Sequence, residues 1–166
     1  QVIGQQDGAA GHESNQRFAD HVKTCEKAGI RPDQTAYFAG YQLGLPQYCT
    51  PLKGLSEGQS GRIYAGVCPP PSDAGFLRGY RLGKAERDKQ NEINGIESRI
   101  RQLEGEISNI EEKAAKGEFS SEEAYAKIRK RKREIRKLRD ERQDLSDDLV
   151  MIRRDVDWFA SNPQAE

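Results

Sequence analysis

The stretch from residue 93 to residue 110 reads INGIESRIRQLEGEISNI, and its isoleucines and leucine recur at alternating steps of three and four. A second apolar run on the same spacing covers residues 124–159, with Arg131 and Arg142 at two of its repeating positions. The segment KGEFSS, residues 116–121, separates the two runs and offers a glycine for a turn. This pattern predicts an antiparallel helical hairpin with a coiled-coil seam.

The start of the second hairpin helix is well marked. Ser120 and Glu123 have the spacing of a capping box, with the serine as N-cap and the glutamate three residues later. We therefore expect this helix to begin next to Ser120.

Composition divides the 166 residues into two parts. Fourteen of the 16 glycines and six of the seven prolines precede residue 96, and charged and aliphatic residues dominate beyond it. We expect an all-α protein with a short glycine-rich, cysteine-containing helical head at 1–84. A long antiparallel coiled-coil hairpin at 85–160, turning near 116–120, and a disordered tail at 161–166 should follow it.

The head should be helical in short pieces. Residues 15–28 place apolar side chains on one face, and a second helix should start at Asp33 as N-cap and end by Pro46. Residues 50–70 are expected to be mostly loop, with at most one helical turn. Ser72 and the aspartate after it should open a third helix that runs into the hairpin.

The head also contains a short internal sequence repeat. AGYQLG at 39–44 matches RGYRLG at 78–83, and glycines four residues apart recur at 4 and 8 and at 54 and 58. On a helix such glycines leave a flat strip for another backbone. The polar flanks exclude a membrane GxxxG contact, so helix packing within the head is the favoured interpretation. Approach of a ligand to the bare backbone is the alternative.

Residues that carry chemistry are sparse. His21 and Cys25 stand four residues apart, and a histidine there could activate the thiol. However, the sequence offers no third member of a catalytic set. His12, His21 and the cysteines lack the spacing of a metal site. We therefore assign no catalytic residue, no metal and no cofactor, and expect a protein that is not an enzyme.

Residues 127–139, KIRKRKREIRKLR, hold nine basic side chains and one acidic one. Alone, such a run is typical of a surface for nucleic acid or anionic lipid. Folding about residue 118 would instead set it opposite four glutamates of the other arm, Glu104, Glu106, Glu111 and Glu112. No aromatic residue interrupts the run for base stacking, and the net charge is zero, so we expect no nucleic acid partner.

The three cysteines are Cys25, Cys49 and Cys68. Their spacing is too wide for a CxxC metal or redox motif. Buried thiols of a cytosolic protein and a disulfide in an oxidising compartment both fit the residues alone. A small, glycine-rich head with few aliphatic residues favours a disulfide slightly.

The order and spacing of the glycine, cysteine and aromatic residues in residues 3–83 resemble those of a bacterial domain of unknown function. This domain occurs in predicted envelope lipoproteins of proteobacteria. The resemblance rests on Tyr48-Cys49, on Gly54, Gly58 and Gly61, on Tyr64-Ala65-Gly66-Val67-Cys68-Pro69 and on Gly79-Tyr80 with Gly83. It implies a periplasmic protein anchored through a lipidated cysteine upstream of Gln1, and it implies no activity. An oxidising compartment then favours a disulfide that closes the loop from Cys49 to Cys68, with Cys25 free or joined only in an alternative pairing.

These observations favour a non-enzymatic envelope protein that binds or scaffolds another protein. The alternatives are an immunity or inhibitor protein that blocks a toxin or envelope hydrolase and, more remotely, a thiol enzyme. The hairpin also allows a homo-oligomer. The candidate partner-binding residues are Trp158, Phe159, Arg131, Arg142 and Tyr80, although the first two could instead pack onto the head around Tyr80.

Overall fold

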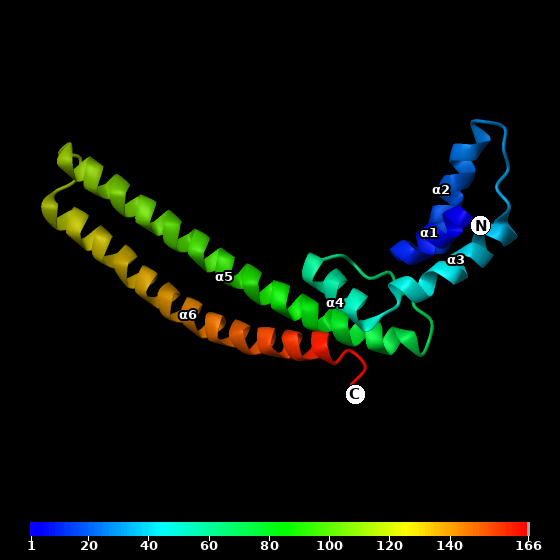
Figure 1. The fold of residues 1–166 in the computed structure, drawn as a ribbon. Helices are drawn as coiled ribbons and strands as arrows, with labels where there is room; N and C mark the ends of the chain where they lie inside the picture. Colours follow the sequence, from blue (N-terminus) through cyan, green and yellow to red (C-terminus); the bar gives the residue numbers. More distant parts are fainter. Residues whose placement is uncertain (166) are drawn as a thin grey trace. The chain divides into compact units, whose positions relative to one another are not determined.

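The computed structural model describes residues 1–165, and this part of the chain is all-α, as predicted. Its helices, labelled in Figure 1, are α1 (Val2–Ala10), α2 (Ser14–Glu26), α3 (Gln34–Tyr48), α4 (Pro51–Ser60), α5 (Ser72–Ala115) and α6 (Ser121–Ser161). Two compact units emerge, residues 1–87 with 154–165 and residues 88–153. Residues 154–165 thus belong to the same compact unit as the head.

The first unit contains two parallel helix pairs in contact through glycines. A β-carbon built at Gly4 would stand 2.0 Å from the carbonyl oxygen of Tyr37, and one built at Gly8 would stand 2.2 Å from that of Tyr41. Both residue numbers rise together, so α1 and α3 run in the same direction (Figure 1). The glycines let the two backbones approach to a separation at which Cα–H groups face carbonyl oxygens.

The second pair, α4 with the start of α5, repeats this geometry. A β-carbon at Gly54 would stand 2.1 Å from the oxygen of Phe76, and one at Gly58 would stand 2.2 Å from that of Tyr80. The sequence repeat therefore corresponds to two copies of one packing unit. Its glycines allow close contact between neighbouring helices.

The two helix pairs also resemble each other at the ends of their helices. Gly11 and Gly61 close α1 and α4 with the same left-handed φ of 71°. The hydroxyl of Tyr41 donates to the carbonyl of His12 at 2.6 Å, and that of Tyr80 donates to the carbonyl of Arg62 at 2.8 Å. Each parallel pair needs a connection that returns along it. In the first copy α2 and the loop after it provide that connection, and in the second the segment 62–71 does.

Two expectations about the head were wrong. Residues 51–60 form the regular helix α4, capped by Thr50, rather than a loop, because the glycines at 54 and 58 permit close packing instead of breaking the helix. Helix α3 also continues through Pro46 to Tyr48. A proline so near the end removes only one backbone donor, and Tyr48 gains a buried ring contact with Phe76, 5.0 Å between centroids.

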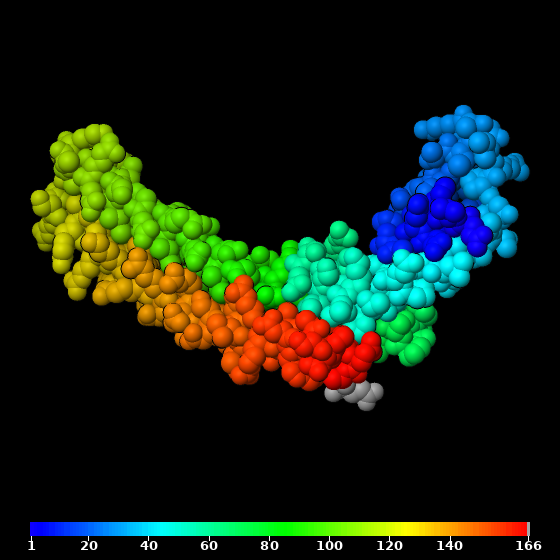
Figure 2. Space-filling model, in the orientation of Figure 1, coloured from blue at the N-terminus to red at the C-terminus, as the bar shows by residue number. Residues whose placement is uncertain are grey.

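The second unit consists of the facing stretches of α5 and α6, whose atoms touch along its length in Figure 2. Ile100, Leu103 and Ile135 form its core, with Ile96, Ile107 and Leu138 around them. At the start of α6, the Glu123 side chain accepts hydrogen bonds from the Ser120 amide and hydroxyl, and Ser120 accepts the Glu123 amide. The capping box is therefore confirmed.

Candidate functional site

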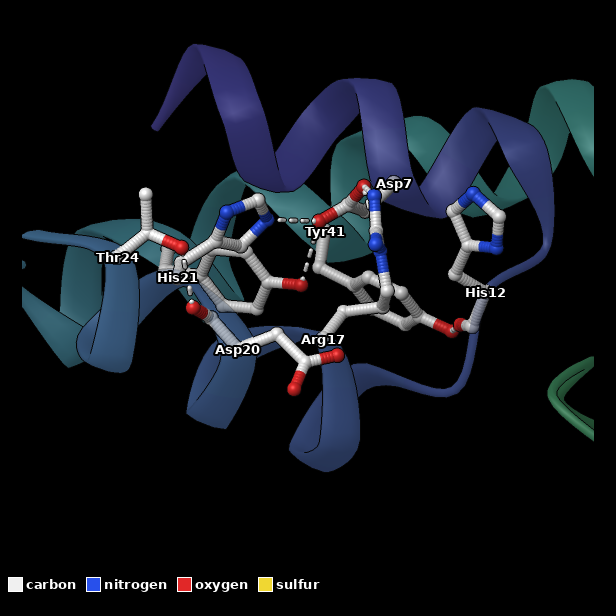
Figure 3. Close-up of polar contacts among 8 residues, drawn as sticks. Asp7, His12, Arg17, Asp20, His21, Thr24 and Tyr41 are labelled. Carbon is white, nitrogen blue, oxygen red and sulfur yellow. Dashed lines mark hydrogen bonds and ion pairs between the residues drawn. The ribbon is translucent and has the colours of Figure 1, made fainter.

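A buried aspartate joins three helices of the head. Asp7 of α1 is only 5% exposed, and its Oδ2 lies 2.7 Å from Nε2 of His21 on α2 (Figure 3). The same oxygen accepts a hydrogen bond from the hydroxyl of Tyr37 on α3 at 2.9 Å, and Arg17 reaches Oδ1 at 3.4 Å. Asp7 therefore fixes α2 against the first helix pair.

The surroundings of Asp7 hold it in the charged form. Burial alone would raise the pKa of its carboxyl group, but the hydrogen bonds from His21 and Tyr37 and the charge of Arg17 outweigh burial and leave the pKa below its ordinary value. Burial and the bond to Asp7 raise the pKa of the Tyr37 hydroxyl well above its ordinary value. At neutral pH this cluster thus contains an ionised acceptor and a neutral donor, as a structural anchor requires.

The second copy of the packing unit carries an acid at the matching place. Glu57 of α4 is 4% exposed, and its Oε1 lies 3.0 Å from Nζ of Lys53 and 3.5 Å from Nη1 of Arg62. Asp7 and Glu57 each follow the first glycine of their pair by three residues. Neither acid was among the candidate site residues from the sequence, although the repeated spacing was a signal that could have singled out both.

His21 and Cys25 do not form a pair. His21 turns to Asp7, and the described residues show no hydrogen bond between the imidazole and the half-buried free thiol of Cys25. Cys49 and Cys68 form the predicted disulfide, with Cα atoms 5.5 Å apart. Both half-cystines lie in the core of the head, so the disulfide ties the end of α3 to the segment before α5.

The aromatic partner-binding candidates differ in exposure. Phe159 is 6% exposed, and its ring lies 3.1 Å from where a β-carbon of Gly79 would stand, so it belongs to the core of the first unit. Trp158 is 55% exposed. Tyr80 is half-buried and lies beside the rings of Tyr64 and Phe76, with its hydroxyl bonded to the carbonyl of Arg62.

The two seam arginines reach acids of the opposite arm. Nε of Arg131 lies 3.1 Å from Oε2 of Glu106, and Nη1 of Arg142 lies 3.9 Å from Oε1 of Glu97. Arg139 also pairs with Glu104 at 3.1 Å. Within the described chain Arg131 and Arg139 are the members of the basic run 127–139 that form ion pairs. The expected charge matching between the arms is therefore partial.

A surface groove of about 770 Å³ lies between the arms, which we call the hairpin groove. Apolar side chains line it, namely Ile107, Ile128, Ile135 and Tyr125, and Tyr125 is 67% exposed. Charged side chains complete the lining: Arg129, Lys132, Arg136 and Arg139 from α6, and Glu104 and Glu111 from α5. Tyr125 was not among the predicted site residues, because the apolar periodicity selects only the seam.

Within residues 1–165 no three His, Cys, Asp or Glu side chains gather as a metal site would need. None of the helices in this range has the length and hydropathy to cross a membrane.

A protein-family model described as "Protein of unknown function (DUF2799)" matches residues 1–85, just over half of the chain. The match spans both copies of the glycine-packed helix pair. No curated protein and no solved structure matches the chain. The chain belongs to this family of unknown function.

Proposed function

We propose that this member of the DUF2799 family is a non-enzymatic binding protein of the bacterial cell envelope that holds a protein partner in the hairpin groove. The observation that carries the proposal is the groove itself, an apolar strip with an exposed tyrosine and a mostly basic rim. Exposed aromatic side chains beside arginines are the residues that protein interfaces favour.

The charges of the groove indicate the kind of partner. Four of its lining side chains are cationic and two are acidic, and one cation, Arg139, is already paired with Glu104. Arg129, Lys132 and Arg136 form no ion pair among the described residues. A protein segment with apolar side chains and several acidic groups would complement this lining in both shape and charge.

The disulfide supports the proposed location. Disulfides persist in oxidising compartments such as the periplasm and are rare in the cytosol, and Cys49 and Cys68 are joined within the core of the head. A lipid anchor upstream of Gln1 is the part of the proposal that only the resemblance to envelope lipoproteins supports.

Affinity capture from envelope extracts tests the proposal. The full chain should retain a specific protein partner, and Tyr125→Ala or Arg129→Glu should lose it. Trp158→Ala distinguishes the groove from the site suggested by the sequence alone, since Trp158 is a similarly exposed aromatic residue outside the groove, and this variant should retain the partner. An unchanged partner with Tyr125→Ala, or loss with Trp158→Ala alone, would contradict a binding site in the groove.

A further inference from the structure

We propose that α6 pairs antiparallel with α6 of a second copy of this chain, through the side that faces away from α5. This outer stripe consists of side chains spaced alternately four and three residues apart: Ala126, Lys130, Arg133, Lys137, Asp140, Asp144, Asp147 and Met151. All are exposed. The stripe is separate from the hairpin groove.

The charged positions of the outer stripe are symmetric about its centre, and the charges on the two sides have opposite signs. Three cations come first and three acids follow, and the change of sign falls between Lys137 and Asp140. The centre of this arrangement is the midpoint between Leu138 and Arg139. For each cation before the midpoint, one acid lies the same number of residues after it. Lys137 matches Asp140 in this way, Arg133 matches Asp144, and Lys130 matches Asp147.

A two-fold axis through that midpoint would place every cation opposite an acid of the other copy. A symmetric dimer uses the same patch on both partners, so each matched pair occurs twice. Ala126 and Met151, at the ends of the stripe, match each other in the same way and supply apolar contact.

Within one chain the outer stripe is electrostatically unfavourable. Like charges three and four residues apart on a helix repel one another, and this spacing separates Lys130, Arg133 and Lys137 and, further along, the three aspartates. Among the described residues none of these six side chains forms an ion pair, and Asp147 accepts a hydrogen bond only from Gln143 of its own helix. Antiparallel pairing would convert this repulsion into attraction.

The balance of charge favours a second copy over other occupants. The stripe holds equal numbers of cations and acids, so a polyanion such as DNA or an anionic membrane would be repelled by half of it. A second copy matches both halves. Because exposed ion pairs are weak and screened by salt, the dimer should form at low ionic strength and dissociate as salt is added.

Charge exchange tests the proposal by sedimentation velocity on the full chain. One variant carries Lys130→Glu, Arg133→Glu and Lys137→Glu, and the other carries Asp140→Lys, Asp144→Lys and Asp147→Lys. Each variant alone should lose the dimer, an equal mixture of the two should form heterodimers, and the chain with all six changes should dimerise again. Circular dichroism checks that helix content is retained.

Failure of the dimer is readily distinguished from failure of the proposed function, because none of these substitutions lies in the hairpin groove. A wild-type chain that stays monomeric at low salt and high protein concentration would overturn the proposal. The proposal would also be overturned if the wild-type chain forms a dimer and either three-residue variant alone still forms it. A crosslink check adds Arg133→Cys and Asp144→Cys to a Cys25→Ser background, where oxidation should join two chains. Absence of a joined species at low salt would also count against the pairing.

Discussion

Gly8 of α1 faces the carbonyl oxygen of Tyr41 so closely that a β-carbon at position 8 would stand 2.2 Å from it. Gly58 and Tyr80 reproduce this relationship at the same 2.2 Å in the second helix pair. The obstacle in both cases is backbone, which cannot move aside as a side chain can. Each pair of helices therefore depends on the absence of a side chain at these positions.

Gly8→Ala and Gly58→Ala should each destabilise the head. Overpacking of this kind destabilises proteins by about 1–3 kcal/mol, and more where backbone must shift. Gly105→Ala is the control, because a β-carbon there would meet nothing within 4 Å. It should stabilise α5 by up to about 1 kcal/mol through helix propensity. Urea unfolding measures all three, and equal effects at Gly8 and Gly105 would contradict the close packing.

Reduction of the disulfide should weaken the head. Cys49 and Cys68 close a loop with a sequence separation of 19, and closing such a loop is worth about 3 kcal/mol in the chain-entropy model. The melting temperature should fall on adding reductant and in the double variant Cys49→Ser, Cys68→Ser. Cys25→Ser should leave it unchanged, and a melting temperature insensitive to reductant would argue against the assignment.

Loss of the Asp7 carboxylate should change the acid stability of the head. The pKa of Asp7 is lower in the folded chain than its ordinary value, so its contribution is present above about pH 4 and is lost as the pH falls through the folded-state pKa. Asp7→Asn should remove that part of the acid dependence and destabilise the head at neutral pH by about 1–3 kcal/mol. The exposed Asp20→Asn should do neither, and parallel unfolding curves over a pH series compare the two.

The contacts between the arms predict unequal effects for two nearby glutamates. Glu106 pairs with Arg131 across the seam, whereas Glu111 forms no ion pair among the described residues. Glu106→Lys should lower the stability of the hairpin by a few tenths of a kcal/mol, as is usual for exposed pairs. Glu111→Lys should have a smaller effect. Thermal unfolding at low salt resolves the difference, and it should shrink as salt is added.

The sequence predicted the elements that depend on local signals. The spacing of isoleucine and leucine, the capping box at Ser120 and the N-cap at Asp33 each correspond to a physical preference that acts over a few residues. The pairing of Cys49 with Cys68 followed from the resemblance and from the loop between them.

The packing role of the repeated glycines was also predicted, but other features that depend on tertiary contact were missed. Residues 51–60 were expected to be mostly loop, but they form α4, whose glycines at 54 and 58 allow close contact with α5. Helix α3 was also expected to end by Pro46, but it continues to Tyr48. The roles of Asp7 and Glu57 become visible only once the helices are paired, because their partners lie on other turns and other helices.

The proposed binding site is tested most directly by photo-crosslinking in living cells. A photoreactive phenylalanine analogue replaces Tyr125 in one full-length variant and Trp158 in another, and both positions are exposed. We expect a discrete, light-dependent adduct with another protein at position 125, and none of that size at position 158. The absence of an adduct at position 125, or the same adduct at both positions, would contradict a partner held in the hairpin groove.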